Sequence, residues 1–270
     1  MLSARELLLK KQIQAMPDLP SLSVHVLQLI RLLGAVDVDM QAVFTTIRRD
    51  PTLVTRMLKV INSSLYSLPR RIETVEQAVT LLGIKKIKEL VLSSAVMDVI
   101  QSRDATLWEH SFSTGTLCAE VIRKHRIQVS PILGLCALLH DIGQLVLSIF
   151  NAEGVKLAAI KAKSEDLADY DAERQVIGCD HAQVGSWLLE NWKLDEEIRN
   201  VISAHHSPHP PREVLREVLL LRFCDAVDEA VRGKAVVVPD RDELALVGLD
   251  ILDFDEWADY QSKQLISEQK

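Results

Sequence analysis

Residues 137–143 read Ala137-Leu138-Leu139-His140-Asp141-Ile142-Gly143 and combine a leucine-rich run with an adjacent histidine and aspartate. This stretch lies inside an apolar helical pattern that starts at Ser130-Pro131 and runs to about Phe150. An ionisable pair left unpaired among leucines would cost several kcal/mol, so His140 and Asp141 need a partner. A cation or a buried polar network would supply one. For an isolated His-Asp dipeptide, the alternative is a core histidine hydrogen-bonded to its neighbours.

Further histidines and carboxylates accompany this pair. Five of the eight histidines fall in one series, each on or at the end of a predicted helix. The candidate metal ligands are His110, His140, Asp141, His181, His205, His206 and Asp225. Imidazole and carboxylate groups without a thiolate suit divalent iron, manganese, zinc, nickel or magnesium, and differ from a structural zinc clip. Seven such groups are enough for two metal ions.

The order of these motifs resembles the HD superfamily of metal-dependent phosphohydrolases. Within that superfamily it most closely resembles the HDOD domain, a regulatory relative found in bacterial signalling proteins. The matching segments are Pro51-Thr52-Leu53-Val54, Val60-Ile61-Asn62-Ser63, Thr74 to Val79 with Leu82-Gly83, Trp108-Glu109-His110-Ser111, Leu138 to Gly143, Ile177 to Gly185, Trp192, and His205-His206-Ser207-Pro208. They cover roughly residues 17 to 230, which is far more specific than a lone His-Asp pair.

The resemblance implies an all-α fold, an HD-superfamily helical bundle with an N-terminal helical HDOD subdomain. It also implies roles for the candidate ligands. The core HD ligands would be His110, His140, Asp141 and Asp225, and the extra histidines of HD-GYP cyclic-dinucleotide phosphodiesterases would be His181, His205 and His206. Glu173 matches a recurrent acidic position of the HDOD pattern.

Metal chemistry of the HD superfamily supplies an enzyme hypothesis. A divalent ion lowers the pKa of bound water and withdraws charge from a phosphoryl oxygen. Asp141 would then be the catalytic residue. The substrate would be a phosphoester, such as a nucleotide or a cyclic dinucleotide, and the activity that of a phosphodiesterase or phosphatase.

Two departures from the HD-GYP pattern favour a regulatory role. Gln144 stands where those enzymes carry a lysine, and Ser207-Pro208-His209-Pro210-Pro211 replaces their Gly-Tyr-Pro segment. We therefore expect a bacterial signalling module that acts mainly through contacts with signalling proteins. Its metal would be a structural centre or a sensor, and the metal-dependent phosphohydrolase is the alternative.

Charge is divided unevenly along the chain. The net charge is -7, yet residues 1–100 carry four more basic than acidic residues, and residues 101–270 carry eleven more acidic than basic residues. The acidic part argues against nucleic-acid binding, which depends on clustered Lys and Arg. The helix predicted over 51–62 closely follows the helix predicted over 39–49, as in a helix-turn-helix motif. The second contains only Arg56 and Lys59 as cations, so packing within a bundle is favoured over DNA binding.

The composition of the chain indicates in which cellular compartment the protein is expected. No apolar run is expected to reach the roughly 18 to 20 residues that span a bilayer. The amino terminus has no signal-peptide pattern. Four cysteines lie in apolar contexts without Cys-x-x-Cys spacing, so free thiols in a reducing cytoplasm are expected.

Apolar periodicity predicts helices throughout, and the one β-branched run, at 236–239, is short. Thr74 and Gln77 form a capping box ahead of a helix that Gly83 ends. A boundary near Gln101-Ser102-Arg103-Asp104 would divide an N-terminal HDOD subdomain, 1–102, from an HD-like metal-binding subdomain, 103–270.

Two helices of the second subdomain should deliver ligands. A helix over 105–125 turns His110 inward, and one over 212–232 delivers Asp225, with Asp228 one turn further and able to substitute for it. On the helix that contains His140 and Asp141, Gly143 would let a neighbouring backbone come close.

Overall fold

The computed structural model describes residues 4–16, 19–35, 37–63, 65–66, 68, 70–234 and 236–268. These residues form fifteen α-helices and one short 3-10 helix, with no strand among them, so the predicted all-α fold is confirmed. The helices are α1 (Ala4–Gln14), α2 (Val24–Leu33), α3 (Met40–Arg48), α4 (Pro51–Ile61), α5 (Val75–Gln101), α6 (Ala105–His125), α7 (Leu133–Leu139), α8 (Ile142–Phe150), α9 (Ala152–Glu165), α10 (Asp169–Val176), α11 (His181–Asn191), α12 (Glu196–Ala204), η1 (Arg212–Val214), α13 (Leu215–Val231), α14 (Arg241–Val247) and α15 (Ile251–Glu268).

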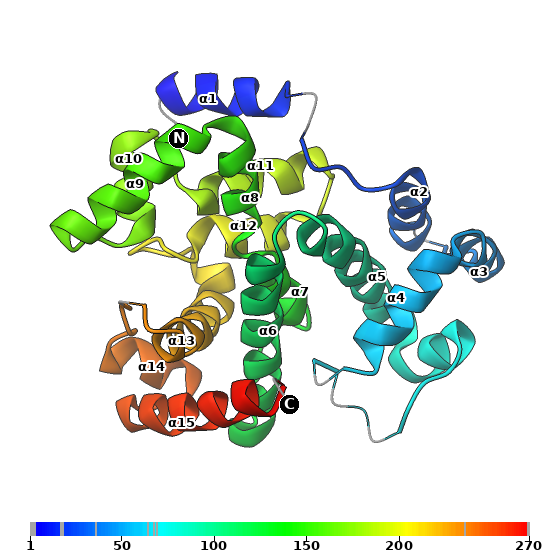
Figure 1. Ribbon diagram of the computed structural model, residues 1–270. Coiled ribbons are helices and arrows are strands. Elements are labelled where there is room, and N and C mark those ends of the chain that lie inside the picture. The colour runs from blue at the N-terminus through cyan, green and yellow to red at the C-terminus, as the bar shows by residue number, and fades with distance from the viewer. Residues whose placement is uncertain are drawn as a thin grey trace.

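The helices lie in two groups, α2 to α5 on one side and α6 to α15 on the other (Figure 1). Helix α1 crosses over to the second group and packs on α11. There Gln14 Nε2 donates to the carbonyl of Trp187 at 3.4 Å. Trp192 Nε1 likewise donates to the carbonyl of Pro20 at 2.9 Å. The start of the chain therefore packs on the second group of helices, while the division of the sequence at residue 102 stays a prediction.

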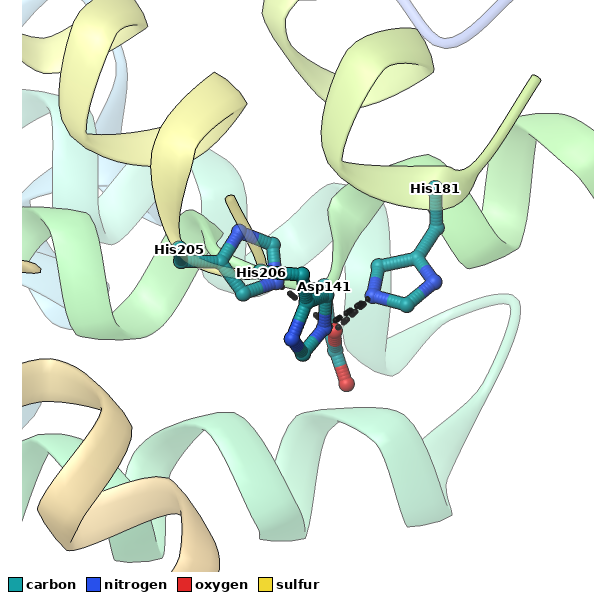
Figure 2. Close-up of side chains that lie close together, drawn as sticks. All are labelled: Asp141, His181, His205 and His206. Atoms are coloured by element: carbon teal, nitrogen blue, oxygen red, sulfur yellow. Dashed lines mark hydrogen bonds and ion pairs between the residues drawn. The ribbon is translucent and has the colours of Figure 1, made fainter. Parts of the chain in front are cut away.

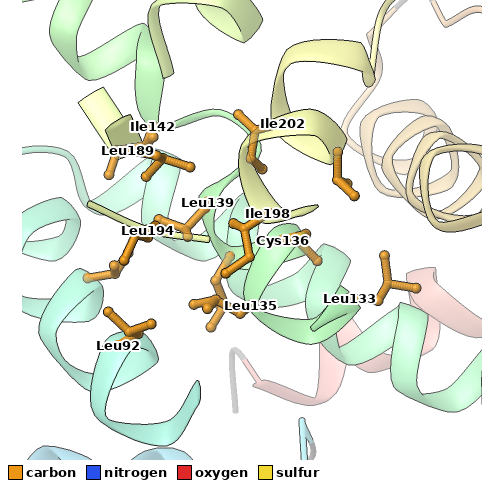
Figure 3. Packing of buried hydrophobic residues seen from close by; sticks show 14 of the residues in the cluster. Leu92, Leu133, Leu135, Cys136, Leu139, Ile142, Leu189, Leu194, Ile198 and Ile202 are labelled. Atoms are coloured by element: carbon orange, nitrogen blue, oxygen red, sulfur yellow. The ribbon is translucent and has the colours of Figure 1, made fainter. Parts of the chain in front are cut away.

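Helix α7 lies at the centre of the apolar core. Its leucines, its cysteine and Ala137 are buried, and they pack against Leu92 of α5 and Ile198 and Ile202 of α12 (Figure 3). Burying one leucine side chain contributes about 2 kcal/mol, so this short helix is held by packing more than by its own propensity. The position of His140, which follows the carboxyl end of α7, is therefore fixed by this packing.

The apolar pattern around His140 and Asp141 is not one helix. The chain leaves helical geometry at Asp141, whose φ is -97° and ψ is 6°, so α7 ends and α8 begins there. His140 Nδ1 contacts the carbonyl oxygen of Ala137 at 2.7 Å, and this contact competes with the backbone bond that would continue the helix. The expectation of an uninterrupted helix is wrong at this point.

The expectation that no apolar run is long enough to cross a membrane is wrong on composition. Residues 133–150 have a mean hydropathy of 1.7 over 18 residues. However, 72% of that window is buried inside the structure, and the break at Asp141 divides it. Core helices of this kind pass the same composition test, which makes the run weak support for a membrane span.

Several predicted helix ends are confirmed and others are corrected. Thr74 and Gln77 form the expected capping box, and Gly83 kinks α5 with a φ of 75°. The helix predicted over 212–232 begins with the separate 3-10 turn η1 before α13. Helix α14 was not expected from the sequence pattern.

Candidate metal centre

The structure brings all seven predicted ligands together in the second group of helices. Six are buried and His206 is partly buried. His110 comes from α6, His140 and Asp141 from the α7–α8 break, His181 from the first position of α11, His205 and His206 from the end of α12, and Asp225 from α13. They form two groups, within each of which the candidate ligand atoms lie within 4.8 Å of one another.

The first group is His110, His140 and Asp225. His110 Nε2 lies 3.2 Å from His140 Nε2 and 3.1 Å from Asp225 Oδ1. His140 Nε2 lies 3.4 Å from the same Asp225 oxygen. Two imidazole nitrogens and one carboxylate oxygen therefore converge on one point, which is the donor set of a divalent cation.

The second group is Asp141, His181, His205 and His206 (Figure 2). His181 Nε2 lies 2.9 Å from His206 Nε2 and 3.2 Å from Asp141 Oδ1. His205 Nε2 lies 3.9 Å from Asp141 Oδ1. The ring of His206 stacks on Tyr170, with centroids 4.2 Å apart.

Asp141 links the two groups. Its Oδ1 faces His181 and His205, while its Oδ2 lies 3.6 Å from His110 Nε2 and 3.5 Å from His140 Nε2. Gln144 Nε2 donates to Oδ2 at 2.7 Å, which fixes the plane of the carboxylate. The arrangement suits a carboxylate that bridges two cations.

The inward direction of four imidazole Nε2 atoms is set by contacts at the other ring nitrogen. Each Nδ1 faces a protein oxygen, namely Asp228 Oδ2 for His110 at 2.7 Å, the Ala137 carbonyl for His140 at 2.7 Å, Glu173 Oε2 for His181 at 2.8 Å and the Ile202 carbonyl for His205 at 2.6 Å. Such outer contacts fix the orientation of the ring and the tautomer of metal-binding histidines.

Burial and mutual charge shape the protonation of this cluster. Burial, together with the charges of His181 and His140, lowers the pKa of His205 to about 4. Burial alone would raise the pKa of Asp141, but the charges of the surrounding histidines, His140 first, lower it to about 2. Asp141 is therefore ionised and His205 neutral, which are the forms that bind cations. Burial alone would lower the pKa of His110 and of His181, but their carboxylate neighbours raise it to about 10, so a cation that binds these two rings displaces a proton from each.

Two buried atoms of the cluster give an independent test of whether a metal fits. His205 Nε2 and Asp225 Oδ1 have no hydrogen-bond partner in the part of the chain that the structure describes. An unsatisfied buried polar atom costs about 1–3 kcal/mol. His205 belongs to the second group of ligands and Asp225 to the first, so a cation in each group would accept one of these lone pairs and remove this penalty. The residues therefore fit a metal.

A cavity of about 440 Å³ opens beside the cluster. Its lining includes Tyr170, Arg174, His205, His206, Arg222 and Asp225. Arg222 Nε donates to the carbonyl of His205 at 2.6 Å, so this arginine also holds the end of α12 in place. A small molecule in the cavity would reach both ligand groups from the same side.

Asp228 orients a ligand and does not take the place of one. It was expected as a substitute for Asp225, whereas it contacts His110 Nδ1 from behind and is not among the grouped ligands. Glu173, which was noted only through the family pattern, contacts both the backbone nitrogen and Nδ1 of His181 at 2.8 Å.

Comparisons with known proteins agree with this fold. The profile of the HDOD domain matches residues 19–208. An uncharacterised protein of Treponema pallidum is 28% identical over 223 residues, which make up 80% of this chain and 43% of that protein. The chain thus spans less than half the length of this curated relative.

Solved structures show the same architecture. An HDOD domain protein from Geobacter sulfurreducens is 24% identical, with a TM-score of 0.70 over 96% of this chain and 88% of that one. A protein from Shewanella amazonensis, provisionally named a phosphohydrolase, is 21% identical, with a TM-score of 0.71 over 93% of both chains. At these identities the likeness shows the fold alone. With the profile match over most of its length, the chain belongs to the HDOD domain family.

Proposed function

We propose that this protein is a regulatory HDOD module whose HD-type centre binds one or two divalent cations, and which acts through contacts with signalling proteins. The observation that carries the proposal is the position of Asp141, whose two oxygens face two separate groups of imidazole and carboxylate donors. A carboxylate in that position repels its acidic neighbour Asp225 unless positive charge lies between them.

The donor chemistry narrows the choice of ion. Both groups consist of nitrogen and carboxylate oxygen, and no cysteine belongs to either of them. Iron, manganese, zinc, nickel and magnesium are compatible with that set, and soft ions are disfavoured. The four cysteines are buried free thiols elsewhere, which supports the proposed cytoplasmic setting of a bacterial protein.

The surroundings of Asp141 favour regulation over catalysis. Gln144 occupies the position where the related phosphodiesterases have a lysine, and its amide is bonded to Asp141 Oδ2. A neutral amide adds no charge that would attract a phosphate. In the cavity wall, Arg174 lies 2.5 Å from Asp180 Oδ2 and Arg222 lies 3.6 Å from Glu243 Oε1, so both arginines are already paired.

Metal-dependent phosphoester hydrolysis is the second candidate, and the cavity beside the cluster favours it. Bound divalent ions would lower the pKa of water and polarise a phosphoryl oxygen. The role of this chain would be to hold Asp141 between the two groups of ligands. Arg174 and Arg222 of the wall would orient the ester only where its phosphate displaced their carboxylate partners, Asp180 and Glu243. Asp141 remains the residue we assign to catalysis under this candidate.

Nucleic-acid binding receives little support from the helices that suggested it. Arg56 of α4 lies 2.5 Å from Asp98 Oδ1, and its side chain is only 17% exposed. A cation held by a carboxylate in this way does not reach a phosphate backbone. Loss of retention on DNA with rising salt is the quick check for this reading.

Elemental analysis of the purified protein tests the proposal. We expect one to two equivalents of a divalent transition metal, which His140→Ala reduces and His209→Ala leaves unchanged. His209 is a matched control because it is an exposed histidine in the loop after α12. Absence of metal from the wild type, before and after incubation with Mn²⁺ or Fe²⁺, would refute the metal centre.

Activity assays separate the two candidates. The metal-loaded protein is given bis(p-nitrophenyl) phosphate and, separately, cyclic dinucleotides. For the regulatory module we expect no turnover above that of His140→Ala. Turnover that His140→Ala abolishes and His209→Ala preserves would replace the regulatory proposal with the enzyme.

A further inference from the structure

Asp228 is completely buried behind the first group of ligands, and its carboxylate oxygens make four hydrogen bonds. Oδ2 lies 2.7 Å from His110 Nδ1 and accepts from Arg232 Nε at 2.6 Å. Oδ1 accepts from Ser113 Oγ at 2.6 Å and from Gln261 Nε2 at 2.7 Å. A carboxylate with donors at both oxygens has one orientation, so the histidine ring bonded to it also has one orientation.

Gln261 reaches this carboxylate from α15, the last helix of the chain. Its side chain is 3% exposed, and its amide also contacts Ser113 Oγ. The amide nitrogen must face Asp228, because an ionised carboxylate only accepts hydrogen bonds. Helix α15 lies wholly after residue 208, where the match to the HDOD profile ends.

We infer that Gln261 is a positioning residue for the metal centre, which acts through Asp228 on His110. This inference rests on the proposed metal binding. The chain of contacts is continuous: Gln261 holds Asp228, Asp228 holds His110 Nδ1, and His110 Nε2 lies 3.2 Å from His140 Nε2 at the centre of the first group. Helix α15 thereby takes part in setting the affinity of that group.

The chemistry of glutamine suits this role. Its amide is a neutral donor, so it supports the charge of Asp228 without adding a cation beside Arg232, which lies 2.6 Å from the same carboxylate. Without the amide, Oδ1 keeps only the Ser113 hydroxyl, which can rotate, and Asp228 can turn away from His110. Among the described residues no contact joins Gln261 directly to the second group of ligands, so we expect the loss of affinity to fall mainly on the first group.

The test uses Gln261→Met, which keeps the length of the side chain and removes the donor. Lys263→Ala, at an exposed position two residues further on α15, is the control. Metal-free protein that contains all 270 residues is titrated with Co²⁺ and followed by visible absorption, and thermal unfolding of the same samples reports the fold. We expect Gln261→Met to weaken binding of one Co²⁺ about tenfold or more and to change its absorption band, as loss of an outer-shell contact does. The control should bind as the wild type does.

A second variant covers the case in which Gln261→Met does not fold. Ser113→Ala removes the other donor to Asp228 Oδ1 from α6, and the same single-site loss is expected. Binding equal to wild type in a folded Gln261→Met, or in Ser113→Ala when Gln261→Met does not fold, would overturn the inference while the metal centre stands. A wild type that binds no Co²⁺ would overturn both.

Discussion

Replacement of Gly143 by alanine tests how tightly the metal centre is built. Gly143 lies in α8, two residues after Asp141, and α8 packs against α11 at this point. A Cβ atom on Gly143 would stand 1.9 Å from the carbonyl oxygen of His181 and 2.7 Å from the backbone nitrogen of Gly185. The expected close approach of a neighbouring backbone is confirmed, and both atoms belong to main chain that cannot rotate away.

The size of the effect follows from these distances. The contact with the His181 carbonyl oxygen, at 1.9 Å, is about 1.6 Å shorter than the roughly 3.5 Å of an ordinary non-bonded contact. Overpacking of a core costs typically about 1–3 kcal/mol. Because backbone lies on both sides, we expect about 3 kcal/mol, out of a total stability of roughly 5–15 kcal/mol. The shift of α11 would also separate His181 Nε2 from Asp141 Oδ1, now 3.2 Å apart, and weaken the second group of ligands.

Gly134→Ala is the matched control, since it lies on the neighbouring α7. Within the described part of the chain, its Cβ would meet Leu65 Cδ1 at 3.8 Å, an ordinary contact. Helix propensity alone would stabilise that variant by up to about 1 kcal/mol. Urea unfolding of both metal-free variants, followed by metal titration, measures the difference. Equal stability of Gly143→Ala and Gly134→Ala would refute the close packing of α8 on α11 and the reasoning built on it.

Three further perturbations have defined outcomes. Removal of metal by a chelator should lower the unfolding temperature, because an ion at a hundredfold excess over its Kd stabilises by about 2.7 kcal/mol, and readdition of Mn²⁺ in a thermal scan should restore it. Glu173→Gln should weaken metal binding about 10–100-fold, since it removes the charged partner of His181 Nδ1, and unchanged binding in a metal titration would contradict the role given to Glu173. Trp192→Phe should destabilise the protein by about 1–3 kcal/mol in urea unfolding, because the buried Pro20 carbonyl loses its donor, and a change below about 0.5 kcal/mol would count against that bond.

The sequence pattern identified features that depend on local chemistry. Asp50, Thr74 and Asp180 accept from the first turns of their helices, as their positions before apolar runs predict. Asp195 shows the limit of that logic. It stands at the start of α12 without a capping bond, because its carboxylate pairs with Lys88 of α5 at 2.6 Å. A partner 107 residues away is invisible to local pattern.

In the candidate site, too, some features were predicted from the sequence and others depend on contacts between distant residues. The order of motifs predicted that histidines and aspartates from separate helices would meet, and the structure places them together. Metal occupancy of the site stays a prediction. The break at Asp141 was missed because leucine and isoleucine continue on both sides of it, so apolar periodicity carries no sign of an interruption. Gln261 was missed because a glutamine on an amphipathic helix looks like surface until its contact with Asp228 is seen.

The break at Asp141 also explains how one carboxylate can serve two groups of donors. In a continuous helix His140 and Asp141 would point about 100° apart from a single axis. With α7 ending at His140 and α8 starting after Asp141, each residue is oriented by a different helix. Helix α7 is held by the packing of α5 and α12, and α8 by its close contact with α11. The position of Asp141 therefore depends on both sides of the molecule. Metal loading that draws the two ligand groups together would act on α7 and, through Leu92 and its neighbours, on the helices α2 to α5, which is the coupling that the proposed regulatory role requires.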